Sequence, residues 1–221
     1  GFHIKSLFKE SFKMLTYKYF FPVVLLIILS SCSNFKNIEV FFEDGFLYAA
    51  QKDLISELKL VTTRKEIKTT LSKQEWIEDF KIKFRINGNI KVIIKTKIPI
   101  FIWNEKYYVD TNMKTFGFDK SNHRLINVFC PSNQLNQARD LIDFINSSLI
   151  LDQISFKKLD FKYSSGWILL SNTTEIKFGK NITTARLNSF RQSLNYVYES
   201  KSIPSMIDLR YKDGVAFDYG K

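Results

Sequence analysis

The chain has 221 residues, of which 45% are hydrophobic and 15% aromatic, so it can bury one large core or two smaller ones and is not a disordered chain. Its 33 Lys and Arg against 22 Asp and Glu give a formal net charge of +11. These charges are scattered and form no run of five or more, which argues against a nucleic-acid-binding protein. With two cysteines, Cys32 and Cys130, neither a disulfide framework nor a CxxC metal site is available.

The N-terminal part of the chain has the pattern of a membrane anchor. Residues 1–18 carry four lysines against one glutamate, and residues 19–35 carry no charge. As a helix rising about 1.5 Å per residue, residues 19–35 would span about 25 Å, close to the ~30 Å hydrocarbon core of a bilayer. The positive-inside rule places residues 1–18 in the cytoplasm and 36–221 outside it. The sequence therefore predicts a single N-terminal transmembrane helix over residues 19–35.

Three alternatives remain for this apolar segment. It could be a cleaved signal peptide. Alternatively, Leu29-Ser30-Ser31-Cys32 resembles a lipobox, in which Cys32 would carry lipid and become the mature N-terminus. A buried soluble helix is the third alternative, but the uninterrupted aliphatic run 23–29 leaves it no polar face.

Residues 36–97 show five expected elements in the order β-α-α-β-β. Thr63 and Glu66 have the spacing of a capping box, which predicts the start of the second helix, and Asn87-Gly88 predicts a hairpin turn between the last two strands. In chain order the elements are a strand at 38–42, helices at 51–58 and 64–71, a strand from Trp76 to Phe84, and a strand at 90–96.

Residues 98–221 change to short strands and turns. The expected strands cover 98–103, 106–110, 114–118, 156–163, 167–170 and 175–178, with helices after Ser132 and at 184–198, and a final hairpin of 206–210 and 215–219 turned at Lys212-Asp213-Gly214. No repeat or low-complexity linker separates this region from the preceding one. The prediction is an α+β protein that ends in an antiparallel β-sheet domain with flanking helices.

Two ordered stretches resemble the FtsQ/DivIB family of cell division proteins. Residues 76–116 are similar to that family's Trp-Val strand, the strand after it and a Val-Asp hairpin, and residues 207–217, IDLRYKDGVAF, look like its terminal Asp-Leu-Arg-Tyr-x-x-Gly hairpin. The chain departs from the pattern at Thr96-Lys97, where the family has Glu-Arg. It departs again at Ser164-Ser165-Gly166, where members often carry basic residues before the tryptophan.

The resemblance implies a complete domain plan. It assigns a cytoplasmic tail to residues 1–18, a transmembrane helix to 19–35, a POTRA domain to 36–97 and a C-terminal β domain to 98–221. A protein of this plan would lie in the cell inner membrane as a single-pass protein with its bulk in the periplasm. It would be a scaffold of the divisome, would need no cofactor, and would link recruitment to septal peptidoglycan synthesis.

The resemblance also implies partners and a binding surface. The partners would be FtsB and FtsL, with FtsK, FtsW and FtsI as further candidates. An edge strand can accept a partner strand by β-augmentation, although the last strand could also simply close the sheet. We expect Tyr211 and Tyr219 to be aromatic anchors, and Gly214 to let the turn form and a partner backbone approach. Carried over by motif position, the partner-binding residues are Arg210, Tyr211, Gly214, Val215, Ala216, Phe217 and Tyr219.

Catalysis has little support in the sequence. The two histidines are His3 and His123, which the predicted topology places on opposite sides of the membrane, so no histidine-based triad can form with both. Adjacent carboxylates such as Glu78-Asp79 point to different sides of a strand and face solvent. We therefore expect a binding protein and not an enzyme. The alternative function is a POTRA-containing envelope-biogenesis lipoprotein anchored through Cys32; a hydrolase of the envelope is a third, weaker possibility.

Overall fold

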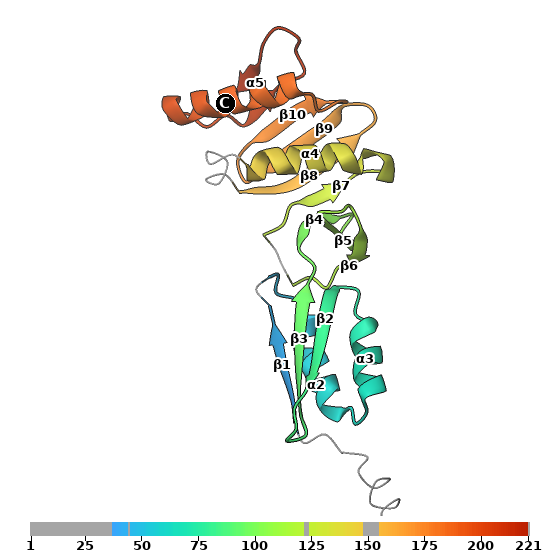
Figure 1. Ribbon diagram of the computed structural model, residues 1–221. Coiled ribbons are helices and arrows are strands. Elements are labelled where there is room, and N and C mark those ends of the chain that lie inside the picture. Colours follow the sequence, from blue (N-terminus) through green and yellow to red (C-terminus); the bar gives the residue numbers. More distant parts are fainter. Residues whose placement is uncertain (1–36, 44, 122–123, 148–154, 221) are drawn as a thin grey trace, which may run out of the picture.

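The computed structural model describes residues 37–43, 45–121, 124–147 and 155–220. They form an elongated α+β molecule with a three-stranded sheet at one end and a nine-stranded sheet over the remainder (Figure 1). The predicted α+β class is confirmed. The apolar segment 19–35 and Cys32 lie outside the described residues, and none of the described helices is long and apolar enough to cross a bilayer.

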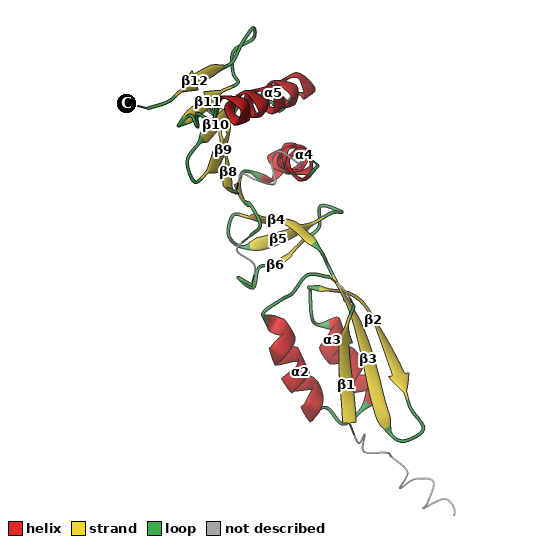
Figure 2. Cartoon of the chain, turned by 90° about the vertical axis from the view of Figure 1, so that its left-hand side faces the viewer, coloured by secondary structure: helices red, strands yellow, loops and turns green. Residues whose placement is uncertain are grey.

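The three-stranded sheet carries two helices on one face (Figure 2). Its elements follow the predicted order: β1 (Asn37–Phe42), α2 (Ala50–Leu60), α3 (Arg64–Ser72), β2 (Ile77–Phe84) and β3 (Asn89–Thr96). The strand order is β1-β3-β2. β1 runs parallel to β3, and β2 runs antiparallel to it.

The core between the two helices and this sheet is built from residues at regular spacings. The helices bury residues four apart, Leu54 and Leu58 in α2 and Ile67 and Leu71 in α3, while β3 buries alternate residues, Ile90, Val92 and Ile94. The start of α3 is held by the predicted capping box, in which the Thr63 hydroxyl accepts from the Glu66 N–H at 3.2 Å and the Glu66 carboxylate accepts from the Thr63 N–H at 3.1 Å.

The nine-stranded sheet has the order β12-β11-β10-β9-β8-β7-β4-β5-β6. Its elements are β4 (Pro99–Trp103), β5 (Tyr107–Asp110), β6 (Thr115–Gly117), β7 (Asn127–Phe129), the 3-10 helix η1 (Ser132–Gln134), α4 (Leu135–Asn146), β8 (Phe156–Lys162), β9 (Gly166–Ser171), β10 (Glu175–Gly179), α5 (Thr184–Ser200), β11 (Met206–Asp208) and β12 (Ala216–Asp218). α4 and α5 lie side by side against it (Figure 1).

The prediction of an antiparallel sheet is wrong for part of this sheet. β4 and β7, β7 and β8, and β10 and β11 pair in parallel. Parallel neighbours need a crossover connection instead of a tight turn. α4 supplies that crossover between β7 and β8, and α5 supplies it between β10 and β11. The helices expected merely to flank the sheet are therefore its crossovers.

β7 is the strand that the sequence pattern did not reveal. It has three residues, which is too short for alternation to be recognised. Val128 at its centre is fully buried, and Cys130 just after it is 6% exposed. β7 joins β4 on one side and β8 on the other, so it connects the two halves of the nine-stranded sheet.

An aromatic cluster joins the two sheets. Tyr48 and Trp76 from the first region pack in one core with Tyr108 and Phe116 from β5 and β6, with ring centroids 5.3 Å apart for Tyr48 and Trp76 and 5.7 Å apart for Tyr48 and Tyr108. The Tyr48 hydroxyl donates to the Lys97 carbonyl at 2.7 Å. Burial raises the pKa of Tyr108 to about 12, from an ordinary value near 10.

Asp119 adds a polar link beside this cluster. Its carboxylate accepts from the Tyr108 hydroxyl at 2.9 Å and from the Ala49 N–H, at the start of α2, at 2.8 Å. The first region is thus tied to the second by packing and by hydrogen bonds.

Leu58 and Leu60 allow a matched test of the core between α2, α3 and the three-stranded sheet. Leu58 is 0% exposed and Leu60 is 83% exposed on the same helix. We expect Leu58→Ala to lower the free energy of unfolding by about 2–5 kcal/mol, because it removes buried methyl groups and leaves a cavity. Leu60→Ala should change it by less than about 0.5 kcal/mol. Urea denaturation of residues 36–221 measures both, and equal effects would contradict the described packing of α2.

Candidate partner-binding edge at the last strand

The last strand lies at the edge of the nine-stranded sheet. β12 pairs antiparallel with β11, with Ile207 opposite Phe217 and Asp208 opposite Ala216. Among the described strands β11 is its one neighbour, so the other side of β12 carries backbone groups that no described strand pairs. Figure 2 shows this strand at the end of the sheet, beside the C-terminus.

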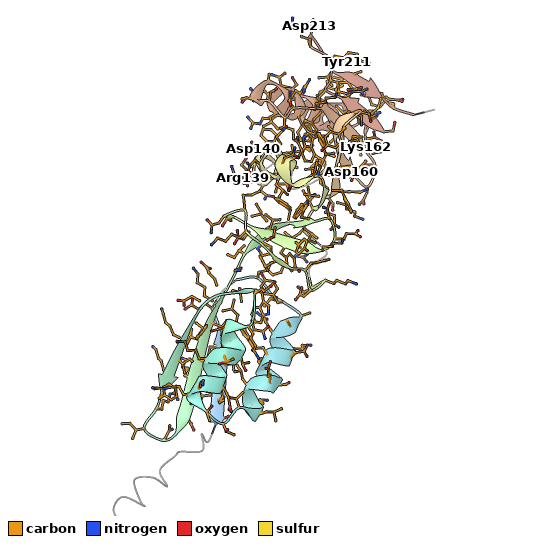
Figure 3. All side chains as sticks on the ribbon, turned by 90° about the vertical axis from the view of Figure 1, so that its right-hand side faces the viewer. Arg139, Asp140, Asp160, Lys162, Tyr211 and Asp213 are labelled. Carbon is orange, nitrogen blue, oxygen red and sulfur yellow. The ribbon has the colours of Figure 1, made fainter. Side chains whose placement is uncertain are left out.

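The loop from Leu209 to Val215 projects from this edge. Figure 3 shows Tyr211 and Asp213 at the outer end of the molecule, and the Tyr211 side chain is 61% exposed. We expected Gly214 to let the turn form, but the turn does not require a glycine there, because its φ lies outside the left-handed region and a Cβ would meet nothing within 4 Å. The loop is long enough for ordinary residues to close it. The open space around Gly214 leaves room for an approaching backbone.

Arg210 is held at the base of the loop by a buried carboxylate. Its Nε donates to Asp208 Oδ1 at 2.9 Å and its Nη2 donates to Asp208 Oδ2 at 2.6 Å. Asp208 is 2% exposed, and the hydrogen bonds from the Arg210 side chain hold the pKa of that carboxyl below its usual range. The Arg210 side chain itself stays 44% exposed, so it anchors the loop and still reaches the surface.

Three aromatic rings form a ridge next to β12. The Phe217 ring lies 5.4 Å from the Tyr196 ring on α5 and is stacked at 6.4 Å with the Tyr219 ring. Tyr196 is 54% exposed and Tyr219 is 45% exposed, whereas Phe217 and Val215 are half-buried and pack on the core. We call Tyr196, Phe217 and Tyr219 the aromatic ridge.

The sequence analysis missed two residues of this surface. Tyr196 lies on α5, and its sequence position gave no sign that it contacts the last strand. Arg186, near the start of α5, lies beside Arg210: a Cβ built on Gly179 would be 3.4 Å from Arg186 Nη1 and 3.4 Å from Arg210 Cγ. The structure therefore brings two arginines together near the start of β9, where the sequence has no basic residue before Trp167.

The seven residues predicted from the sequence all lie in this hairpin, but they differ in exposure and contacts. Tyr211 and Tyr219 are exposed, Ala216 lies in the edge strand, and Gly214 sits in the open loop. Val215 and Phe217 pack on the core, and Arg210 is tied to Asp208.

The described surface also has a hollow beside α5. This hollow of about 640 Å³ lies beside the C-terminal half of α5, lined by apolar side chains including Ile176, Val197, Ile203 and Ile207 and by hydroxyl and amide groups such as Thr174 and Asn172. In the described part of the chain, no three His, Cys, Asp or Glu side chains gather closely enough to hold a metal ion.

Comparison with known proteins shows distant similarity. No family model matches the chain. The chain is 27% identical over 169 residues to an uncharacterized protein of Acanthamoeba polyphaga mimivirus, and the aligned region covers 73% of this chain and 32% of that protein. It is 23% identical over 149 residues to cell division protein FtsQ of Escherichia coli, with 64% of this chain and 54% of that protein aligned. It is 20% identical over 146 residues to cell division protein FtsQ of Neisseria meningitidis, with 65% of this chain and 62% of that protein aligned.

The similarity therefore supports a distant relationship between this chain and FtsQ proteins. The chain spans between about a third and about three fifths of the length of these relatives. Two FtsQ proteins from different bacteria match a similar share of it, which agrees with the motif resemblance at residues 76–116 and 207–217. The similarity points to a division-related protein.

The pair of Asp208 and Arg210 predicts a pH-dependent contribution to stability. Because the folded-state pKa of Asp208 is lowered, the pair stabilises the fold above the ordinary carboxyl pKa of about 4, and this stabilisation is lost as pH falls through the folded-state value. Asp208→Asn should cost about 1–3 kcal/mol at pH 7 and less at pH 3, as measured by urea denaturation. Asp213→Asn, in the exposed loop, should cost less than about 0.5 kcal/mol at pH 7. A cost for Asp208→Asn that does not depend on pH would contradict the role of this ion pair.

Proposed function

We propose that this chain is an FtsQ-like scaffold of the bacterial cell division machinery that binds FtsB, paired with FtsL, through its last strand. The observation that carries the proposal is the exposed edge of β12 with its aromatic ridge, in a chain distantly similar to two FtsQ proteins. In this proposal residues 19–35 anchor the protein in the inner membrane, residues 36–97 are a POTRA domain, and the bulk of the chain lies in the periplasm.

The proposed binding mode is β-augmentation. An edge strand presents a row of backbone N–H and C=O groups that can pair with an extended peptide. Left uncovered, such an edge is an aggregation hazard. A partner strand added to β12 would satisfy these groups and extend the nine-stranded sheet by one strand. The backbone would supply affinity, and side chains beside the strand would supply specificity.

The side chains beside β12 fit a partner with apolar and acidic residues. Tyr211 and Tyr219 are exposed aromatics of the kind that dominate interface energetics. The ridge formed with Tyr196 offers an apolar surface at the strand, and Arg186 and Arg210 lie together nearby. A partner whose strand carries aromatic residues, flanked by a carboxylate, would match this surface.

The proposed role is scaffolding without catalysis or cofactor. FtsB and FtsL would be held by the C-terminal sheet, while the POTRA region would meet upstream proteins, with FtsK, FtsW and FtsI as candidates. Holding these proteins together would link recruitment to septal peptidoglycan synthesis.

A second candidate function follows from Leu29-Ser30-Ser31-Cys32, which resembles a lipobox. The chain would then be a POTRA-containing envelope-biogenesis lipoprotein anchored through Cys32. Intact mass separates the two proposals, because a lipoprotein loses residues 1–31 and gains acyl chains, whereas a bitopic protein keeps its tail.

The partner proposal predicts the effect of removing one aromatic anchor. Tyr211→Ala should weaken binding of residues 36–221 to the FtsB-like partner of the same genome by at least about tenfold, because an exposed aromatic contact is lost. Tyr107→Ala is the matched control, since Tyr107 is 43% exposed and lies in β5, near the opposite edge of the nine-stranded sheet. Pull-down and titration measure both variants.

Hydrogen exchange locates the contact independently of side chains. With the partner bound, backbone amides of β12 should exchange more slowly, because they gain hydrogen bonds in the added strand. Phe217→Asp should also abolish binding, but it disturbs core packing, so its circular dichroism spectrum must match that of the wild type. A well-folded wild type that binds no FtsB-like partner would overturn the partner proposal.

A further inference from the structure

Two turns meet at the end of the molecule where β1 begins. Asn37 pairs with Asn89 at the start of β3, and Phe84 at the end of β2 pairs with Ile90. The guanidinium of Arg64, at the start of α3, lies 3.8 Å above the Phe84 ring. The turn between β2 and β3 and the turn between α2 and α3 therefore lie side by side, as Figures 1 and 2 both show. We call residues 59–65 and 83–88 the basal tip.

The basal tip exposes apolar side chains. Ile86 is fully exposed at 110% and Leu60 is 83% exposed, the two highest values among the large hydrophobic residues that the structure describes. Phe84 is 38% exposed beside them. Scattered single exposed apolar residues need no explanation, but here the two most exposed ones lie at the same end of the molecule.

The basal tip is also strongly basic. Residues 59–65 and 83–88 contain five cationic residues and no acidic one: Lys59, Arg64, Lys65, Lys83 and Arg85. Two carboxylates contact these segments: Glu39 pairs with Arg85 at 3.7 Å, and Glu66 accepts hydrogen bonds from the N–H groups of Thr62 and Thr63. The five cations less these two carboxylates leave a net charge of +3. Exposed apolar side chains ringed by Lys and Arg are the pattern of a surface that rests on anionic lipid.

We propose that the basal tip docks on the anionic lipid surface of the membrane, with Ile86 and Leu60 entering the interface and the surrounding cations meeting lipid headgroups. The inference rests on the proposed anchoring, because the uncharged segment 19–35 directly precedes β1, which starts at this end. The lipid occupant follows from the charge of the tip and from this continuity. Docking would hold the long axis of the molecule away from the membrane and place β12 at the far end.

The experiment adds a tryptophan to the basal tip of the 221-residue chain, reconstituted in lipid vesicles. Ile86→Trp is compared with Ile203→Trp, a substitution at a position that is 64% exposed and follows α5 at the opposite end of the molecule. The native tryptophans are common to both variants, so wild-type fluorescence is subtracted. Vesicles contain phosphatidylglycerol and lipids brominated on the acyl chain, which quench only tryptophans at the membrane interface. Flotation of the vesicles first establishes that the chain is anchored.

The expected result is strong quenching for Ile86→Trp and none for Ile203→Trp. Adding Lys59→Gln and Lys65→Gln should weaken the contact by about fivefold for each positive charge lost, with the fold kept because both are exposed helix-terminal positions. An anchored Ile86→Trp variant whose added tryptophan is not quenched would overturn the docking inference and leave the partner proposal standing. A chain that fails to float would overturn the anchoring and the docking inference with it.

Discussion

The packing of Tyr48 and Trp76 against Tyr108 and Phe116 connects the two sheets of this protein. The rings come from the segment before α2, the segment before β2, and strands β5 and β6, so this cluster forms only when both regions are folded. Asp119 reinforces it by accepting hydrogen bonds from Tyr108 and from the start of α2. A buried aromatic contact of this kind contributes both area and preferred ring geometry. Because the junction is packed, the two ends of the molecule are held apart.

The position of β12 at the sheet edge depends on the crossovers. α4 lets β8 lie parallel to β7, and α5 lets β11 lie parallel to β10. Each crossover moves the chain one strand further from β6, so the last hairpin is added at the far edge. The same α5 then presents Tyr196 to Phe217. One helix therefore both directs the last strand to the edge and builds the apolar ridge beside it.

The two proposed surfaces lie at opposite ends of the molecule, and each combines apolar side chains with polar or charged groups. The basal tip combines exposed aliphatic side chains with an excess of cations, which suits a lipid surface. The β12 edge combines backbone groups with aromatic rings and a paired arginine, which suits a peptide strand. Asp208 matters here because a buried carboxylate holds Arg210 in place, so the loop carrying Tyr211 starts from a rigid base. A scaffold that joins a membrane to a partner needs such separation.

The sequence by itself determined where most helices and strands lie along the chain. Hydrophobic periods of two and of three to four residues, the capping box at Thr63 and the turn at Asn87-Gly88 are local signals, and they placed every described helix and every strand except β7 within a few residues. The terminal hairpin residues were likewise recognised from a contiguous motif. Only the tertiary structure decided which strands pair in parallel, that β7 bridges the sheet, that Gly214 has ordinary backbone geometry, and that Tyr196 and Arg186 join the hairpin. These outcomes depend on contacts between residues distant in the chain, which local periodicity does not encode.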